Sequence, residues 1–112
     1  MDPADFAANQ WNQMADELIR QGSLRLALRA IYLGILAHLS ENNLIYLAKY
    51  KSNRDYLLEL RRREHVLQGL VPVFSNTVKA FDKAWYGMYD VALEDLKRFR
   101  SQYERIQHLV KA

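Results

Sequence analysis

The sequence predicts an all-α fold: a single compact bundle of about five helices spanning residues 1–112. Three observations support this prediction. Apolar residues recur at intervals of three and four along most of the chain. Turn-forming residues are scarce, with 4 Gly and 2 Pro. Hydrophobic residues make up 50% of the 112, which is enough for one buried core, and a chain of this length has room for one domain.

The first expected helix runs from about Pro3 to Gln21. Asp2 precedes it and can accept a hydrogen bond from an unpaired amide, while Pro3 fits the first turn, where its missing donor is not needed. Gly22 is typical of a helix end. The apolar stripe of this helix, with spacings of four, three and four, consists of Ala7, Trp11, Met14 and Leu18.

The second expected helix, from about Ser23 to Asn42, is apolar over most of its circumference, and its first residue can cap it. Its large apolar residues are Leu24, Leu28, Ile31, Ile35 and Leu39. Its small ones are Ala27, Ala30, Gly34 and Ala37. The two stripes predict a central helix packed on two sides, closely over the small one, and an antiparallel hairpin with the first helix. The face left to water or a partner is expected to carry Arg25, Arg29 and Tyr32.

The third expected helix follows a break in the helical period. Residues 43–51 alternate apolar and polar positions, which predicts an extended connector, with a short β-ribbon as the alternative. Ser52 then starts a helix over about Asn53 to Glu64 in a capping box: its hydroxyl reaches the amide of Asp55, whose carboxylate reaches back. The residues expected to be buried are Tyr56, Leu57 and Leu60.

The last two helices again follow from spacings of three and four. The fourth is expected to carry Leu67, Leu70, Phe74, Val78, Phe81 and Trp85, with Pro72 in its first turn or kinking it. Its end, Trp85-Tyr86-Gly87, is either a core plug closed by a glycine or an aromatic pocket for a partner segment. Asp90 is expected to cap the fifth helix, whose seam consists of Leu93, Leu96, Phe99, Tyr103, Ile106 and Val110.

The sequence holds no motif for catalysis or for a cofactor. With 0 Cys, it offers no disulfide, no thiolate metal site and no thiol nucleophile, which fits a reducing compartment. His38, His65 and His108 lack metal-ligand spacing, and the 4 glycines form no phosphate-binding loop. We therefore expect no enzyme activity, no metal and no cofactor.

The N-terminus and the hydropathy pattern predict a soluble chain. The first residues are acidic, unlike those of a secretory signal, and no apolar h-region follows them. The most apolar uncharged run, residues 30–40, covers about half of the length that crosses a bilayer.

Charge is concentrated in the middle of the chain. Residues 20–63 hold nine basic residues against three acidic ones, a net +6, whereas the whole chain has +3. An excess of +3 is too small to imply nucleic acid as a partner, because proteins that bind it carry a much denser basic face. The basic stretch can contact anionic lipid or nucleic acid. Alternatively it is a solvated helix end, because consecutive residues on a helix point about 100° apart and the three arginines therefore cannot form one stripe. The residues concerned are Lys49, Lys51, Arg61, Arg62 and Arg63.

Three motifs occur in order along the chain: ALRAIYLGIL at 27–36, KSNRDYL at 51–57 and FDKAWYG at 81–87. Together they resemble the bacterial family known as domain of unknown function 4129, and the likeness covers nearly the whole chain. Ser52, Asp55 and Asp82 depart from the family pattern, which has Thr, Glu and Glu there, but keep the chemistry of the group. The shorter acid at Asp55 puts its capping bond in doubt.

The resemblance implies a context and no catalytic residue. Members lie at the C-terminal end of bacterial membrane proteins, some with a transglutaminase-like domain, so this chain is expected on the cytoplasmic side of the inner membrane. We expect a non-catalytic interaction module for an unknown protein partner. The alternatives are an anionic-surface binder and a regulatory domain of a transglutaminase-like enzyme. The candidate partner-binding residues are Arg29, Tyr32, Asn53, Arg54, Tyr56, Trp85 and Tyr86.

Overall fold

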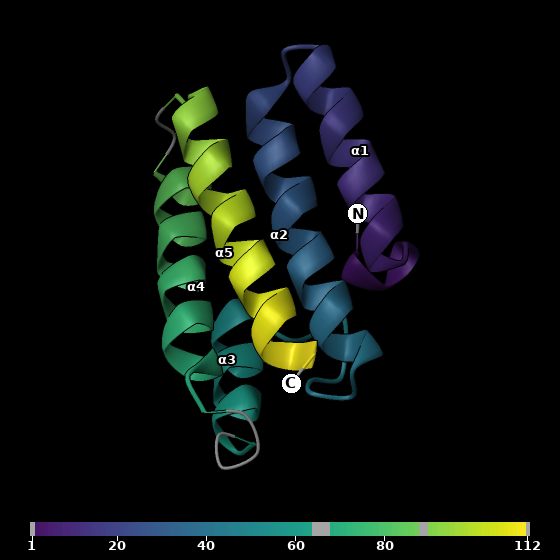
Figure 1. Cartoon of the computed structure of the whole chain (residues 1–112), viewed down its shortest axis with the longest axis vertical. Helices are drawn as coiled ribbons and strands as arrows, with labels where there is room; N and C mark the ends of the chain where they lie inside the picture. Colours follow the sequence, from purple (N-terminus) through teal and green to yellow (C-terminus); the bar gives the residue numbers. More distant parts are fainter. Residues whose placement is uncertain (1, 64–67, 88–89, 112) are drawn as a thin grey trace.

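Five α-helices and one short 3-10 helix make up the fold in the computed structural model, which describes residues 2–63, 68–87 and 90–111 (Figure 1). In chain order the elements are η1 (Pro3–Asp5), α1 (Ala8–Arg20), α2 (Leu24–Glu41), α3 (Asn53–Arg61), α4 (Leu70–Tyr86) and α5 (Leu93–Lys111). No strand occurs within those ranges. The prediction of a compact all-α bundle is confirmed, with a radius of gyration of 13.2 Å.

α1 and α2 form the predicted antiparallel hairpin (Figure 1). Gly22 turns the chain between them at a φ of +78°, a conformation that a side chain would strain. Farther along the hairpin, a Cβ added to Gly34 would lie only 3.2 Å from Trp11 Cβ. The close approach expected at Gly34 is therefore confirmed, and its partner is α1.

The first helix begins later than predicted. Asp2 caps only the single turn of η1, in a capping box. Its carboxylate accepts from Ala4 N, and the carboxylate of Asp5 accepts from Asp2 N. The chain is then extended at Phe6, whose ring packs edge-on against Trp11 with centroids 5.0 Å apart. Burying this ring stabilises a break in the backbone that the apolar period does not reveal.

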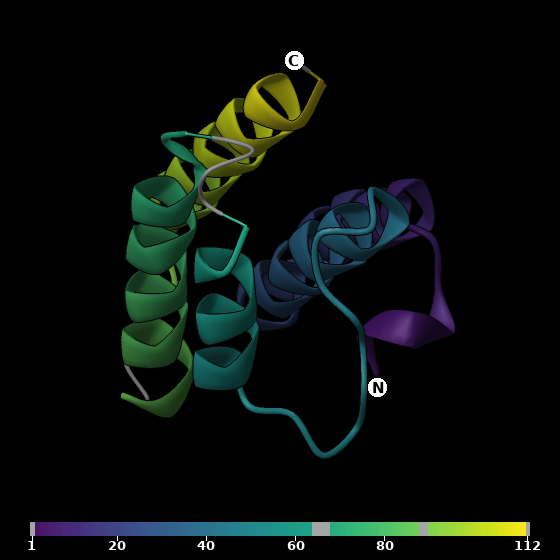
Figure 2. The same cartoon turned by 90° about the horizontal axis from the view of Figure 1, so that it is seen from below.

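The core lies between the α1–α2 hairpin and the remaining helices (Figure 2). α2 is central, as predicted, and buries residues around most of its circumference. Leu93 departs from the predicted seam of α5, because it is 51% exposed. The largest fully buried apolar side chains include Trp11, Leu28, Ile31, Ile35, Phe74 and Ile106.

Two predicted caps are wrong. Ser23 is the N-cap of α2, but its side chain makes no capping hydrogen bond. Asp90 precedes α5 by three residues and does not begin it; the carboxylate of Asp95 instead accepts from Ala92 N at 2.9 Å. α2 therefore begins where Ser23 predicts but without the side-chain bond, whereas α5 begins three residues after its predicted capping residue.

The connector, residues 43–51, contains no strand, so the β-ribbon alternative is wrong. It leaves α2 through Asn43, whose φ of 60° is left-handed, and is anchored by the buried side chains of Leu44 and Ile45. α3 then begins in the predicted capping box and ends at Arg61, while the predicted end at Glu64 lies outside the described residues. The predicted Leu67 of the fourth helix also lies outside them.

Candidate groove between α2, α3 and α4

A groove of about 530 Å³ lies between α2, the start of α3 and the end of α4. η1 and the connector complete its rim, and Figure 2 shows the connector running from α2 to α3 with η1 nearby. Its lining includes six of the seven predicted partner-binding residues: Arg29, Tyr32, Asn53, Tyr56, Trp85 and Tyr86. The seventh, Arg54, is exposed and is not part of the lining.

Three stacked rings form the wall of the groove between α2 and α4. Phe81 lies with its centroid 4.2 Å from that of Tyr32 and 5.9 Å from that of Trp85, each pair at 11° between planes. Tyr32 is only 1% exposed, so it does not face water, which is one of the two alternatives predicted for this face of α2; the other, a face toward a partner, stays a prediction. Because α2 buries residues around most of its circumference, Tyr32 contributes a buried ring to the wall of the groove rather than an exposed surface.

The Tyr32 hydroxyl is buried and lacks a hydrogen-bond partner among the residues that the structure describes. Burial, followed by the negative charge of Asp82, raises the pKa of this tyrosine well above its usual range. The hydroxyl therefore stays protonated at physiological pH.

Two arginines of α2 hold the end of α4. Arg25 donates to the carbonyl oxygens of Ala84 and Trp85, the first at 3.1 Å. Its guanidinium carbon also lies 4.6 Å from the centroid of the Trp85 ring, and that of Arg29 lies 5.5 Å from it. These contacts cap the last carbonyls of the helix and fix the indole beside the groove. Trp85 is half-buried and Tyr86 is 72% exposed, so the end of α4 is only in part the predicted core plug.

The wall on the α3 side is held by tyrosine and amide hydrogen bonds. Asn53 donates through Nδ2 to Asp82 at 2.9 Å, which joins the start of α3 to α4. Tyr56 is 4% exposed, and its hydroxyl donates to the carbonyl of Ala48 at 3.1 Å and accepts from the amide of the same residue at 3.3 Å. Burial raises the pKa of Tyr56. These two residues therefore position the helix and the connector around the groove.

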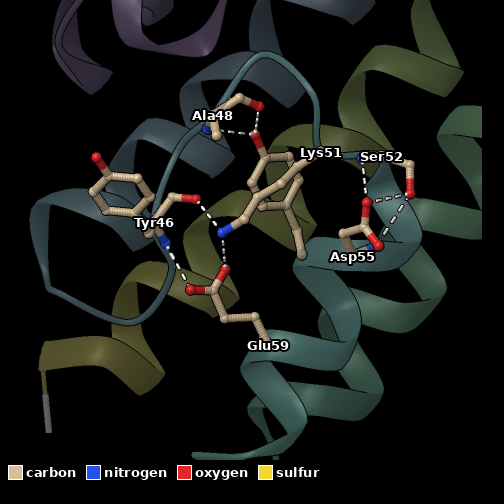
Figure 3. A network of polar contacts seen from close by, with 7 residues as sticks. Tyr46, Ala48, Lys51, Ser52, Asp55 and Glu59 are labelled. Carbon is tan, nitrogen blue, oxygen red and sulfur yellow. Dashed lines mark hydrogen bonds and ion pairs between the residues drawn. The ribbon is translucent and has the colours of Figure 1, made fainter.

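A carboxylate of α3 fastens the connector (Figure 3). Glu59 accepts from Lys51 Nζ at 2.8 Å with one oxygen and from Tyr46 N at 3.0 Å with the other. Lys51 Nζ also donates to Tyr46 O at 2.6 Å. The hydrogen bond to Glu59 raises the pKa of Lys51. The sequence does not reveal Glu59 as part of the site, because its partners lie in a loop that has no period.

The basic stretch does not form one surface. Lys49 is exposed on the rim of the groove, whereas Lys51 is 15% exposed and paired with Glu59. Arg61, Arg62 and Arg63 are exposed at the C-terminal end of α3, whereas the groove lies at its N-terminal end. The two ends of this nine-residue helix are about 13 Å apart. The structure therefore separates the cations that the sequence places together.

No cluster of three or more metal-ligating side chains occurs in the described part of the chain. His38 is half-buried with its ring centroid 5.9 Å from that of Tyr103, and His108 is exposed. His65 lies outside the described residues. Among the helices that the structure describes, none is both long and apolar enough to cross a membrane.

Comparison with known proteins gives no match: no family model, no curated protein and no solved structure is similar to this chain. The likeness of its three motifs to domain of unknown function 4129 stays a prediction from the sequence.

Proposed function

We propose that this chain is a non-catalytic helical interaction module that binds a segment of a partner protein in the groove between α2, α3 and α4. The observation that carries the proposal is the convergence of six predicted partner-binding residues, from three helices, on one concavity of about 530 Å³. Membership of the family named above, and with it a place on the cytoplasmic side of a bacterial membrane protein, is part of the proposal. If the membrane protein that contains this chain also carries a transglutaminase-like domain, this module regulates that domain.

The composition of the groove supports a protein partner. Tyr, Trp and Arg dominate the residues that contribute most to protein–protein binding, because they combine a large apolar area with a hydrogen-bonding group. Trp85, Tyr86 and Arg29 supply these side chains at one end of the groove. The position of Trp85 is set by stacking on Phe81 and by the two arginines of α2 that lie against its ring, so this side chain loses little entropy on binding.

A pull-down with matched variants tests the proposal. Tyr86→Ala removes a ring that lines the groove and is 72% exposed, whereas Tyr50→Ala removes a ring that is 84% exposed outside the groove lining. Both changes leave the core intact. We expect the same protein to be recovered from a lysate of the source cells by the wild type and by Tyr50→Ala, and to be lost with Tyr86→Ala. Equal recovery by the two variants contradicts the proposal.

A further inference from the structure

We propose that the groove binds an uncharged part of its partner segment, and that a carbonyl oxygen of this segment accepts a hydrogen bond from the buried hydroxyl of Tyr32. The inference rests on the proposed function and adds the chemistry of the partner. It depends on two independent observations, which are a buried donor without a partner and a balance of charge around the groove.

The hydroxyl of Tyr32 is a hydrogen-bonding group that the fold leaves unused. Tyr32 lines the groove and is 1% exposed, and its hydroxyl bonds to no residue in the described ranges. Burial raises the pKa of this hydroxyl first, and Asp82, Tyr56 and Tyr86 raise it further through their charges. The hydroxyl therefore lies near these three side chains, two of which, Tyr56 and Tyr86, also line the groove.

Tyr32 is an exception among the buried tyrosines. The described ranges bury two others, Tyr56 and Tyr103. The hydroxyl of Tyr56 donates to the carbonyl of Ala48, and that of Tyr103 accepts from Asn12 at 3.1 Å. Because folded proteins pair nearly all of their buried polar groups, a hydroxyl left over on the wall of a groove indicates a partner that binds there.

The partner group is an acceptor without charge. Because the pKa of Tyr32 is raised, its hydroxyl keeps its proton at physiological pH and is able to donate. A carboxylate in this place would bring a second negative charge into a buried site beside Asp82. A carbonyl oxygen, from the main chain or from Asn or Gln, accepts the hydrogen bond and adds no charge.

The charges around the groove favour neither sign of ligand charge. Within the described residues, the lining and the charged side chains that hydrogen-bond to it hold four cations and four carboxylates. The carboxylates stay negative when they accept hydrogen bonds from amides, so they offset the cations, and an uncharged segment fits this balance. The cations are Arg25, Arg29, Lys49 and Lys51, and the carboxylates are those of Asp2, Asp5, Glu59 and Asp82.

The lining also provides a place for an apolar anchor and a path to the hydroxyl. Leu33, Leu36 and Phe81 line the groove together with Trp85, in a concavity the size of a few side chains. Tyr86 lies near the Tyr32 hydroxyl and is 72% exposed, so its ring can turn aside without disturbing the core. Side chains commonly change rotamer in this way when an interface forms.

Selection from a random peptide library tests the inference. The library is panned on the wild-type chain, and peptides that also bind Tyr86→Ala are discarded. We expect the remaining sequences to share an apolar anchor and to show no excess of either charge. The affinity of the strongest peptide is then measured for Tyr32→Phe and for Tyr103→Phe, which remove one buried hydroxyl inside and outside the groove lining. We expect a loss of roughly tenfold for the first and less than about twofold for the second.

A scan of the same peptide locates the acceptor. Each main-chain amide is replaced in turn by an ester, whose carbonyl is a weaker acceptor, and each Asn or Gln is replaced by Ala. One replacement is expected to weaken binding to the wild type by at least about threefold and to leave binding to Tyr32→Phe unchanged, because the two changes remove the same hydrogen bond.

The outcomes separate the two proposals. Peptides that depend on Tyr86 but bind Tyr32→Phe as tightly as the wild type overturn the carbonyl inference and leave the proposed function standing. The same holds for groove-dependent peptides of high net charge, for equal losses with Tyr32→Phe and Tyr103→Phe, and for a scan in which no replacement depends on Tyr32. A Tyr32→Phe chain that is destabilised without peptide as much as Tyr56→Phe shows that water already pairs the hydroxyl, which also overturns the inference. Failure to recover any groove-dependent peptide overturns both proposals.

Discussion

The ammonium group of Lys51 lies 2.8 Å from Oε1 of Glu59, and the second oxygen of that carboxylate accepts the amide of Tyr46 at 3.0 Å. One side chain of α3 thus holds the connector at two points, one near its middle and one at its C-terminal end (Figure 3). Since Ala48 and Lys49 of the same segment line the groove, this carboxylate determines the position of one of its walls.

Glu59→Gln is expected to loosen the connector. The amide keeps the shape of the side chain but loses the charge that both donors use, so we expect the free energy of unfolding to fall by about 1–3 kcal/mol. Urea denaturation measures this fall, and faster hydrogen exchange at the Tyr46 amide locates it. Glu104→Gln, which removes an exposed carboxylate from α5, is the control and is expected to change neither quantity. Equal effects of both variants contradict the assigned role of Glu59.

The pairing also predicts a dependence on alkaline pH. Because the hydrogen bond to Glu59 raises the pKa of Lys51, the stabilisation is complete at neutral pH, below the ordinary lysine value. It is lost as the pH rises through the pKa of the folded state, above about 10. The difference in stability between wild type and Lys51→Met is expected to narrow there and to be constant between pH 6 and 9. A difference that narrows below about pH 9 contradicts this.

Helical periodicity in the sequence predicts most of this fold, since spacing alone indicates which residues of α4 and α5 face inward. Phe74, Phe81, Phe99 and Ile106 are buried as expected. The same reasoning does not foresee the burial of Tyr32, because it assigns to water or to a partner whatever the stripes leave over, and α2 buries most of its circumference. For a helix surrounded by neighbours, periodicity no longer separates an inner face from an outer one.

The groove could be predicted only in part. The sequence motifs predict Asn53, Trp85 and Tyr86 as partner-binding residues, and all three line the groove. The bonds that place them could not be inferred, since Asn53 to Asp82 and Glu59 to Lys51 join elements whose relative position depends on packing. Side-chain bonds to an irregular loop leave no repeat in a sequence.

The capping box of α3 predicts a loss of stability in acid. Asp55 accepts from Ser52 N at 2.8 Å, so the shorter acid does make the bond that the sequence left in doubt, and this bond lowers the pKa of Asp55. Because the pKa of Asp55 is lower in the folded state, its carboxylate stabilises the fold at every pH above the ordinary aspartate pKa. This stabilisation is lost as the pH falls through the pKa of the folded state, below about pH 4. We expect wild type to exceed Asp55→Asn in stability at neutral pH and to converge with it in acid. Thermal unfolding at a series of pH values measures this, and a constant difference argues against the cap.

Two tyrosines on opposite walls of the groove are expected to respond differently to loss of the hydroxyl. Tyr56→Phe removes the bonds to Ala48 and is expected to lower the free energy of unfolding by about 1 kcal/mol. Tyr32→Phe removes a buried hydroxyl for which the described residues provide no partner, so we expect stability to be unchanged or to rise by up to about 1 kcal/mol. Urea denaturation of both variants decides the point. A similar loss in both means that the Tyr32 hydroxyl has a partner.

Gly34→Ala is expected to destabilise the hairpin although alanine is the better helix former. The gain in helix propensity is about 1 kcal/mol, but the new Cβ would lie 3.2 Å from Trp11 Cβ and 3.6 Å from the carbonyl of Ala8, so α1 must move as a unit. We expect a net loss of about 0.5–2 kcal/mol in chemical denaturation. Trp11→Phe supplies the sharper test, because it changes the ring and keeps the Cβ that the new methyl group meets. The cost of Gly34→Ala is therefore expected to be the same in that background to within about 0.5 kcal/mol. If the cost disappears there, the indole ring and not the closeness of the two backbones requires glycine at this position.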